Sequence, residues 1–121
     1  MSIKDESVFL LELFIHHTYE NHKKEATMFP PQRYATAAVN REIPLAVQLF
    51  LWQCIDALPF SPDYLQVFQL STEDCRLKIV HTQECPDYRK EYLLLSDMPI
   101  TAKIYVINDE THATMLFCEE Y

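Results

Sequence analysis

Side chains that could do chemistry gather in the stretch HTQECPDYRKEY, which runs from His81 to Tyr92. Histidine, carboxylate and thiol groups are the ligands of zinc sites, and a thiol beside a histidine can become a nucleophile. On an extended strand, however, His81 and Cys85 lie roughly 13 Å apart, at about 3.3 Å per residue. One ion cannot bridge that distance, so the spacing predicts neither a metal site nor a cofactor site. It favours a strand that carries His81 on its core face.

A catalytic site built on this stretch would need partners from elsewhere in the chain. His112 and Glu119 could join His81 and Glu84 as a general acid–base set, provided that the fold brings all four together. Tyr88 could stack on a flat ligand. These five residues form the candidate polar site. Because nothing in their spacing forces them together, the sequence assigns no catalytic residue, and an enzyme is the alternative hypothesis.

The composition argues against several functional classes. The net charge is −8 and no run of lysine or arginine exceeds two residues, so direct binding of nucleic acid is not expected. Glycine is absent, which removes glycine-rich phosphate loops. The longest uncharged apolar run falls far short of a membrane span of about 20 residues, and the acidic N-terminus is unlike a signal peptide. We therefore expect a cytoplasmic protein with reduced thiols and no membrane contact.

The hydrophobic pattern predicts one α+β domain. Apolar residues make up 49% of the 121 residues, enough for a core of their own. The turns between the expected strands are too short for crossover helices. We therefore expect a mostly antiparallel sheet of five or six strands, packed on one main helix over 44–58. The pattern predicts a further helix over 3–25 and strands over 33–40, 64–70, 75–84, 91–96, 102–107 and 112–121.

Domain organisation follows from the prolines and from the missing glycines. The prolines of FPP at 29–31 end any preceding helix, so 1–27 is expected to be a helical extension and 28–121 the single domain. Without glycine, turns that need a left-handed residue must use asparagine or aspartate. The candidates are Asn40, Asp63, Asp74, Asp87 and the segment 108–110.

The helix over 44–58 carries two apolar stripes instead of one. Its core stripe is expected to pack on the sheet. The second stripe, formed by Leu45, Leu49 and Trp52 with Asp56 at its end, needs a cover of its own. Either the N-terminal helix covers this stripe, or it is a surface for a protein partner or a homodimer. The second interpretation centres on Trp52, because tryptophan is enriched at interface hot spots.

Five sequence blocks match, in order, those of a family of small proteins. The blocks are RY, QLFLW, DYLQVF, the spaced set H-Q-E-P-Y and HATML…EEY, and together they span residues 28–121. On these blocks the chain resembles a domain-of-unknown-function family, number 960, of low-GC Gram-positive bacteria and their phages. The resemblance implies a small cytosolic protein with no established activity, and it supplies no catalytic residues. Residues 1–27 depart from the family pattern.

The leading hypothesis is a non-catalytic protein-interaction or regulatory protein, with the phage association that the resemblance implies. It would bind an unidentified protein partner, or a second copy, through the Leu45, Leu49 and Trp52 stripe and the segments 81–92 and 112–121. A small enzyme that uses the candidate polar site is the first alternative. An acidic inhibitor of a nucleic-acid enzyme is the second, and it would need carboxylates in rows with phosphate-like spacing.

Overall fold

The computed structural model describes residues 29–121, so the predicted helix over 3–25 and the extension 1–27 lie outside the described residues. The described chain has the predicted α+β fold. Its strands are β1 (Arg33–Ala35), β2 (Leu65–Glu73), β3 (Arg76–Gln83), β4 (Tyr88–Leu95), β5 (Ala102–Asn108) and β6 (Ala113–Phe117). Its helices are α2 (Ala37–Glu42), α3 (Leu45–Asp56) and the short 3-10 helix η1 (Cys118–Glu120).

The six strands form one sheet in the order β1-β6-β5-β2-β3-β4. All neighbours are antiparallel except β1 and β6, which run parallel. The sheet is therefore mixed, and the expectation of a mostly antiparallel sheet is only partly met. The physical reason is that β1 is followed by two helices and four strands before the chain returns beside it as β6, and no hairpin joins the two.

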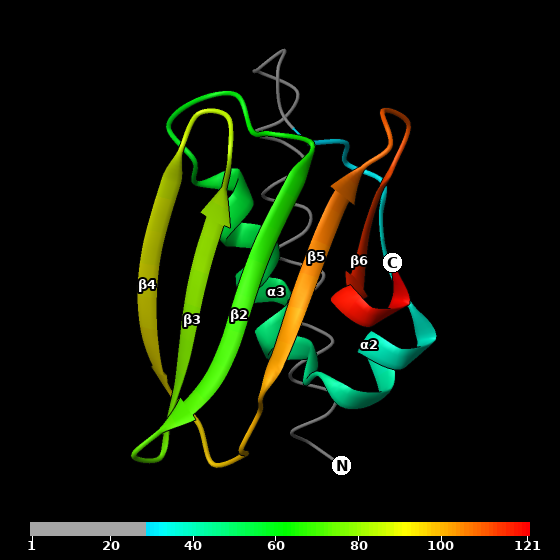
Figure 1. Cartoon of the computed structure of the whole chain (residues 1–121). Helices are drawn as coiled ribbons and strands as arrows, with labels where there is room; N and C mark the ends of the chain where they lie inside the picture. The colour runs from blue at the N-terminus through cyan, green and yellow to red at the C-terminus, as the bar shows by residue number, and fades with distance from the viewer. Residues whose placement is uncertain (1–28) are drawn as a thin grey trace.

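The core lies between the helices and one face of the sheet (Figure 1). Leu51 and Ile55 of α3 meet Phe68, Ile79 and Ile104 of the sheet, and all five are fully removed from solvent. Burial of side chains of this size contributes about 1.5–3 kcal/mol each. Two helices share this face, so the prediction of a single main helix is not confirmed. Among residues 29–121, no helix covers the opposite face, which we call the open face.

The predicted strand over 33–40 is wrong beyond Ala35. Thr36 is the N-cap of α2, where its hydroxyl accepts a hydrogen bond from the Val39 N–H at 3.3 Å. The weak alternation of RYATAAVN hid this cap, although threonine ahead of two alanines is a good helix start. The predicted strand over 112–121 likewise ends at Phe117, where η1 begins. β4 begins at Tyr88, three residues before the predicted start of 91.

The β2–β3 hairpin shows how the chain turns without glycine. Glu73 pairs with Arg76, so Asp74 and Cys75 form a two-residue loop, and both have positive φ values of 47° and 61°. This is the signature of a type I′ turn, which normally takes Asn-Gly or Asp-Gly. Asp74 was a predicted left-handed residue, whereas Cys75 was not. The third positive φ, 68° at Glu110, falls in the predicted segment 108–110.

Candidate functional site

His81 lies in a buried network of polar side chains between β2, β3 and the following turn. The alternation predicted for β3 is confirmed, because His81 and Gln83 face the core and are 0% and 4% exposed. His81 Nε2 lies 2.6 Å from Gln66 Oε1 on the neighbouring strand. Gln66 Nε2 donates to Gln83 Oε1 at 2.7 Å and to the Asp63 carbonyl oxygen at 2.9 Å. Gln83 Nε2 donates to the Pro86 carbonyl oxygen at 2.8 Å.

This network determines the protonation of His81. Because Gln66 Oε1 can only accept, the proton of the neutral ring lies on Nε2. Within residues 29–121, Nδ1 has no hydrogen-bond partner. The ring stacks on Phe68 with 4.3 Å between centroids and meets the edge of Tyr88 at 5.4 Å. Burial among these groups lowers the pKa of His81 from 6.5 to about 4, so the ring is neutral at physiological pH.

The arrangement ties the β3–β4 turn to the start of β2. Asp63 Oδ2 accepts a hydrogen bond from the Cys85 N–H at 3.1 Å, and the Asp63 N–H donates to Gln83 Oε1 at 3.0 Å. These hydrogen bonds hold the turn in position, and the buried ring of His81 is not exposed to a substrate. The sequence argument did not identify Gln66 or Gln83 as members. The sequence feature that could have identified them is a glutamine at a core-facing position, two residues from Phe68 in β2 and two residues from His81 in β3.

The structure brings together only two of the five residues of the candidate polar site. His81 and Tyr88 are in ring contact, and the exposed Glu84 lies in the turn between them. His112 lies beyond β5 at the start of β6, where it contacts Tyr34 with ring centroids 5.7 Å apart. Glu119 is in η1. Because β2 and β5 separate β3 from β6, His81 and His112 lie at least about 14 Å apart.

The second stripe of α3 lies in a largely buried position. Leu49 and Trp52 are 6% and 7% exposed, and Leu45 is half-buried. Asp56, at the end of the stripe, pairs with Arg33 of β1 through two contacts of 2.7 and 2.8 Å. The Arg33 guanidinium also lies 5.0 Å from the centroid of the Trp52 ring. The ion pair therefore ties β1 to α3 and places a cation over the tryptophan.

Gln48 of α3 lies outside the core stripe and caps the end of α2. Gln48, which the helical pattern places away from the core stripe, is 5% exposed. Its side-chain amide donates to the Ile43 carbonyl oxygen at 2.8 Å. That carbonyl follows the last turn of α2, so Gln48 satisfies a group that the helix end leaves without a partner.

Half-buried apolar side chains occupy the open face of the sheet. The strand register places Leu116, Tyr105, Val67 and Thr82 in one cross-strand row. Thr114, Ile107 and Leu65 form the adjacent row. A hollow of about 450 Å³ lies on this face between Tyr64, Tyr105 and Asp63. These two rows give the open face an apolar band, and the next row along β2 and β5 is polar, with Gln69 opposite Lys103.

The strand β4 forms one edge of the sheet and carries exposed leucines on the open face. Leu93 is 54% exposed and Leu95 is 91% exposed. Charge is confined to the first half of the strand, at Arg89, Lys90 and Glu91. Lys78 and Arg89 both contact Glu91, at 3.6 and 2.6 Å, and the hydrogen bond from Arg89 lowers the pKa of Glu91. The second half of the edge has none of the charges or prolines that usually protect an edge strand.

The direction of the β4 backbone groups follows from the register. The Asn108 N–H donates to the Tyr64 carbonyl oxygen at 2.8 Å, so even-numbered residues of β2 bond to β5 and odd-numbered residues bond to β3. In β3, the even-numbered residues therefore bond to β2 and the odd-numbered residues bond to β4. In β4, the backbone groups of the even-numbered residues consequently point toward β3. The odd-numbered residues from 89 to 95 therefore present their N–H and C=O groups at the free edge.

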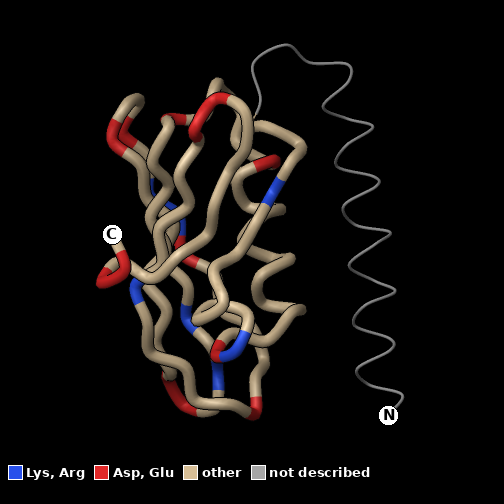
Figure 2. Tube along the Cα trace, turned by 90° about the vertical axis from the view of Figure 1, so that its right-hand side faces the viewer, with Lys and Arg blue, Asp and Glu red and all other residues tan. Residues whose placement is uncertain are grey.

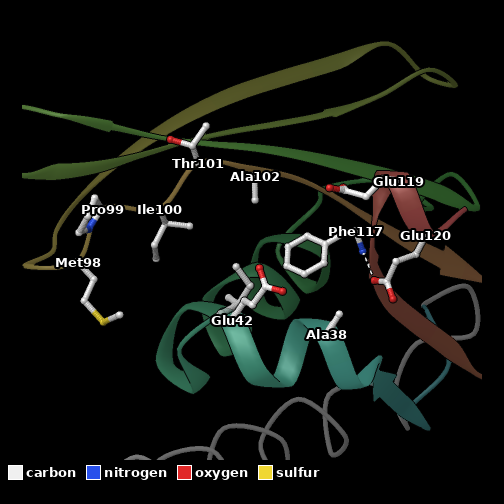
Figure 3. A pocket seen from close by; sticks show the side chains of 11 residues that line it. Ala38, Glu42, Met98, Pro99, Ile100, Thr101, Ala102, Phe117, Glu119 and Glu120 are labelled. Atoms are coloured by element: carbon white, nitrogen blue, oxygen red, sulfur yellow. Dashed lines mark hydrogen bonds between the residues drawn. The ribbon is translucent and has the colours of Figure 1, made fainter.

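A second hollow, the α2 hollow, lies between α2, the β4–β5 loop and η1 (Figure 3). Its volume is about 360 Å³, and Ile43, Ile100 and Phe117 supply apolar lining. Figure 3 shows the carboxylates of Glu42 and Glu119 on either side of the Phe117 ring. None of the described residues that line this hollow is a lysine or an arginine. It therefore combines an apolar lining with a negative rim.

Acidic residues of the described region lie mainly in turns and at the ends of strands (Figure 2). Within residues 29–121, only Glu91 is an acidic residue in the middle of a strand. The same region holds no group of three or more histidine, cysteine or acidic side chains that could bind a metal ion. No helix of the described region is long and apolar enough to cross a membrane. The carboxylates thus lack the continuous row that a mimic of nucleic acid requires along an element.

Comparison with known proteins identifies a family but no activity. No curated protein matches the chain significantly. A solved structure described as a protein of unknown function from Enterococcus faecalis is similar, with a TM-score of 0.63 and 20% sequence identity. The match covers 74% of this chain and 90% of that one, and it shows a shared fold. Residues 32–120 match the family described as "Staphylococcal protein of unknown function (DUF960)", and the chain therefore belongs to this family.

Proposed function

We propose that the protein is a non-catalytic, cytoplasmic protein-interaction module that adds an extended segment of a partner protein to the edge of its sheet. The observation that carries the proposal is the free edge of β4. An eight-residue strand has outward N–H and C=O groups at alternate positions, beside the exposed Leu93 and Leu95. Extended peptides bind such edges through main-chain hydrogen bonds, while alternate side chains give specificity.

A second copy of the chain fits this edge poorly. Two copies of β4, paired antiparallel across a twofold axis, would place residues of the same face opposite each other. Pairing centred on Glu91 sets Glu91 against its own copy and Leu93 against Arg89. Pairing centred on Tyr92 sets Leu93 against Glu91 and Leu95 against Arg89. Both registers oppose like charges or place leucine against charge, which destabilises a sheet. Registers centred on Leu93 or Leu94 would oppose leucines, but within the strand they overlap only over residues 91–95 or 93–95. We therefore assign the edge to a different protein, with apolar residues opposite the leucines.

Several features of the site support binding over catalysis. His81 is neutral, buried and held by Gln66. His112 and Glu119 of the candidate polar site lie beyond β2 and β5, away from His81. By contrast, Leu93 and Leu95 are exposed beside the free edge of β4, where an added strand would contact them.

The experiment uses two variants at one position. Leu93→Pro removes an outward N–H and leaves the ladder to β3 intact, because proline is tolerated on edge strands where its nitrogen faces solvent. Leu93→Thr removes the leucine side chain and keeps the N–H. The wild-type chain and both variants are immobilised, and captured proteins from a lysate of a bacterium that encodes the protein are quantified by mass spectrometry. We expect a partner whose capture falls roughly tenfold with proline, the effect of losing one or two main-chain hydrogen bonds.

The threonine variant and the salt dependence separate the alternatives. Main-chain pairing predicts that Leu93→Thr retains most of the capture and that high salt changes it little. Equal capture by the wild-type and proline variants would refute strand addition. Loss of all capture at high salt would favour the acidic-inhibitor hypothesis. Sedimentation velocity tests self-association, and a dimer that Leu93→Pro dissociates would make a second copy the occupant of the edge.

A further inference from the structure

We propose that the α2 hollow binds the side chain of a lysine from a basic segment of a partner protein. This inference is independent of strand addition at β4, because the hollow lies on the helix-covered side of the sheet. It starts from the lining of the hollow. Three buried side chains border the hollow, and each is at most 7% exposed: Ile43, Ile100 and Phe117. The volume of about 360 Å³ is at the lower end of the range of ligand pockets.

Two carboxylates with no strong partner stand at the rim. Among residues 29–121, Glu42 approaches only Arg41, at 3.6 Å, in a pair whose side chains are 69% and 58% exposed, and such exposed pairs contribute little. Glu119 accepts only a weak bond from the Cys118 thiol, at 3.7 Å. Both carboxylates are therefore available for a ligand cation.

The third acidic residue at the rim has a structural role. Glu120 Oε1 accepts hydrogen bonds from the Phe117 N–H at 2.8 Å and from the Thr36 hydroxyl at 2.9 Å. These bonds hold η1 against the start of α2 and thereby set the position of Glu119. The hollow is consequently a shaped apolar site with two charges from two separate elements.

The chemistry of the hollow selects lysine over the other cations. A metal ion needs several converging ligands, and here an apolar lining separates two carboxylates. Arginine is best matched by one carboxylate in a planar, bidentate pair. Lysine buries its aliphatic stem along apolar surface and keeps a compact head with three rotatable donors at the rim. Such a head would place its charge at the rim, which carries Glu42 and Glu119.

The proposal can be tested with a small probe on the full-length chain. N-acetyl-lysine N-methylamide is titrated at low ionic strength while the methyl resonances of Ile43, Met98 and Ile100 are followed by NMR. The comparison probe is N-acetyl-norleucine N-methylamide, which has the same stem without the charge. We expect saturable shifts of these methyl groups with the lysine probe, at a dissociation constant in the millimolar range. The norleucine probe should bind about tenfold more weakly.

Matched variants separate the hollow from the general acidity of the protein. Glu42→Gln/Glu119→Gln should weaken the lysine probe about tenfold. The control Glu73→Gln/Glu110→Gln removes the same charge from exposed sites elsewhere and should leave binding unchanged. All variants change exposed side chains, and thermal unfolding confirms that they fold.

Four outcomes would overturn the proposal. The first is the absence of methyl shifts with the lysine probe, and the second is equal affinity for the norleucine probe. The third is equal loss in the control variant, which would show that bulk charge attracts the probe. The fourth is displacement of the lysine probe by spermidine at far lower concentration, which would make a free polyamine the ligand.

Discussion

Acidification should destabilise the protein through His81, and the effect can be calculated from the structure. The ring is fully buried, its Nε2–H is bound to Gln66, and its Nδ1 has no partner within residues 29–121. A second proton would have to enter at Nδ1, in an apolar contact with Phe68. For this reason, burial lowers the pKa of His81 in the folded state to about 4.

The sign and size of the effect follow from proton linkage. In the unfolded chain a histidine titrates near pH 6.5, so between pH 6.5 and 4 the unfolded state binds more protons than the folded state. The free energy of unfolding is therefore unaffected by His81 above pH 6.5 and falls as the pH falls toward 4. The loss is about 1 kcal/mol at pH 6, about 2 kcal/mol at pH 5 and about 3 kcal/mol at pH 4.

Urea unfolding at a series of pH values measures this loss, with the fluorescence of Trp52, the single tryptophan, as the signal. The variant His81→Gln cannot titrate and can still hydrogen-bond to Gln66. It should lose most of the pH dependence between 6.5 and 4, whatever its stability at neutral pH. His112→Gln, which removes a histidine from the partly exposed β5–β6 turn, is the matched control. If His81→Gln retains the full slope, the buried neutral histidine is not the cause.

Three further predictions concern stability and reactivity. Arg33→Ala should lower the free energy of unfolding by about 3 kcal/mol, because it leaves the nearly buried Asp56 without its bidentate partner. Cys75→Gly should raise it by about 1 kcal/mol in denaturant unfolding, because glycine adopts the φ of 61° without the cost that a Cβ carries. Cys54 should react with a thiol reagent only after unfolding, because burial raises its pKa to about 11, whereas the exposed Cys75 and Cys85 should react at once in the native protein.

Each of these predictions has its own control or contradicting result. Arg41→Ala, which breaks an exposed pair, should cost no more than about 0.5 kcal/mol. If it matches Arg33→Ala, the buried ion pair has no special weight. A lower midpoint for Cys75→Gly would show that the cysteine side chain stabilises the turn. Rapid native modification of Cys54 would show that the core around α3 opens readily.

The sequence predicted the alternation of β3 correctly because strand geometry is local. Residues two apart share a face, so Ile79 and His81 had to lie together. Cys85, in contrast, lies in the turn after β3 ends at Gln83, where the alternation of an extended strand no longer applies. The absence of glycine similarly predicted that an aspartate would take a left-handed turn position, which Asp74 does. The same local logic failed at 33–40, where the pattern is weak and the Thr36 cap favours a helix.

The binding surfaces, in contrast, depend on contacts between distant segments. Whether a strand lies at an edge depends on the order of strands in the sheet, and sequence alternation is the same for central and edge strands. The second stripe of α3 illustrates the same limit. Its pattern indicated an apolar face, but the Arg33–Asp56 pair and the Arg33 contact with Trp52 depend on β1 reaching the sheet edge beside β6.

The sequence by itself therefore determined an α+β chain with a buried His81, tight glycine-free turns and an acidic charge balance. These properties arise from periodicity and composition, which act over a few residues. Only the tertiary structure decided that β4 has a free edge, that the open face lacks a helix from the described region, and that Glu42 and Glu119 share one hollow. Those properties require residues far apart in the chain to meet, and no local pattern encodes the packing that brings them together.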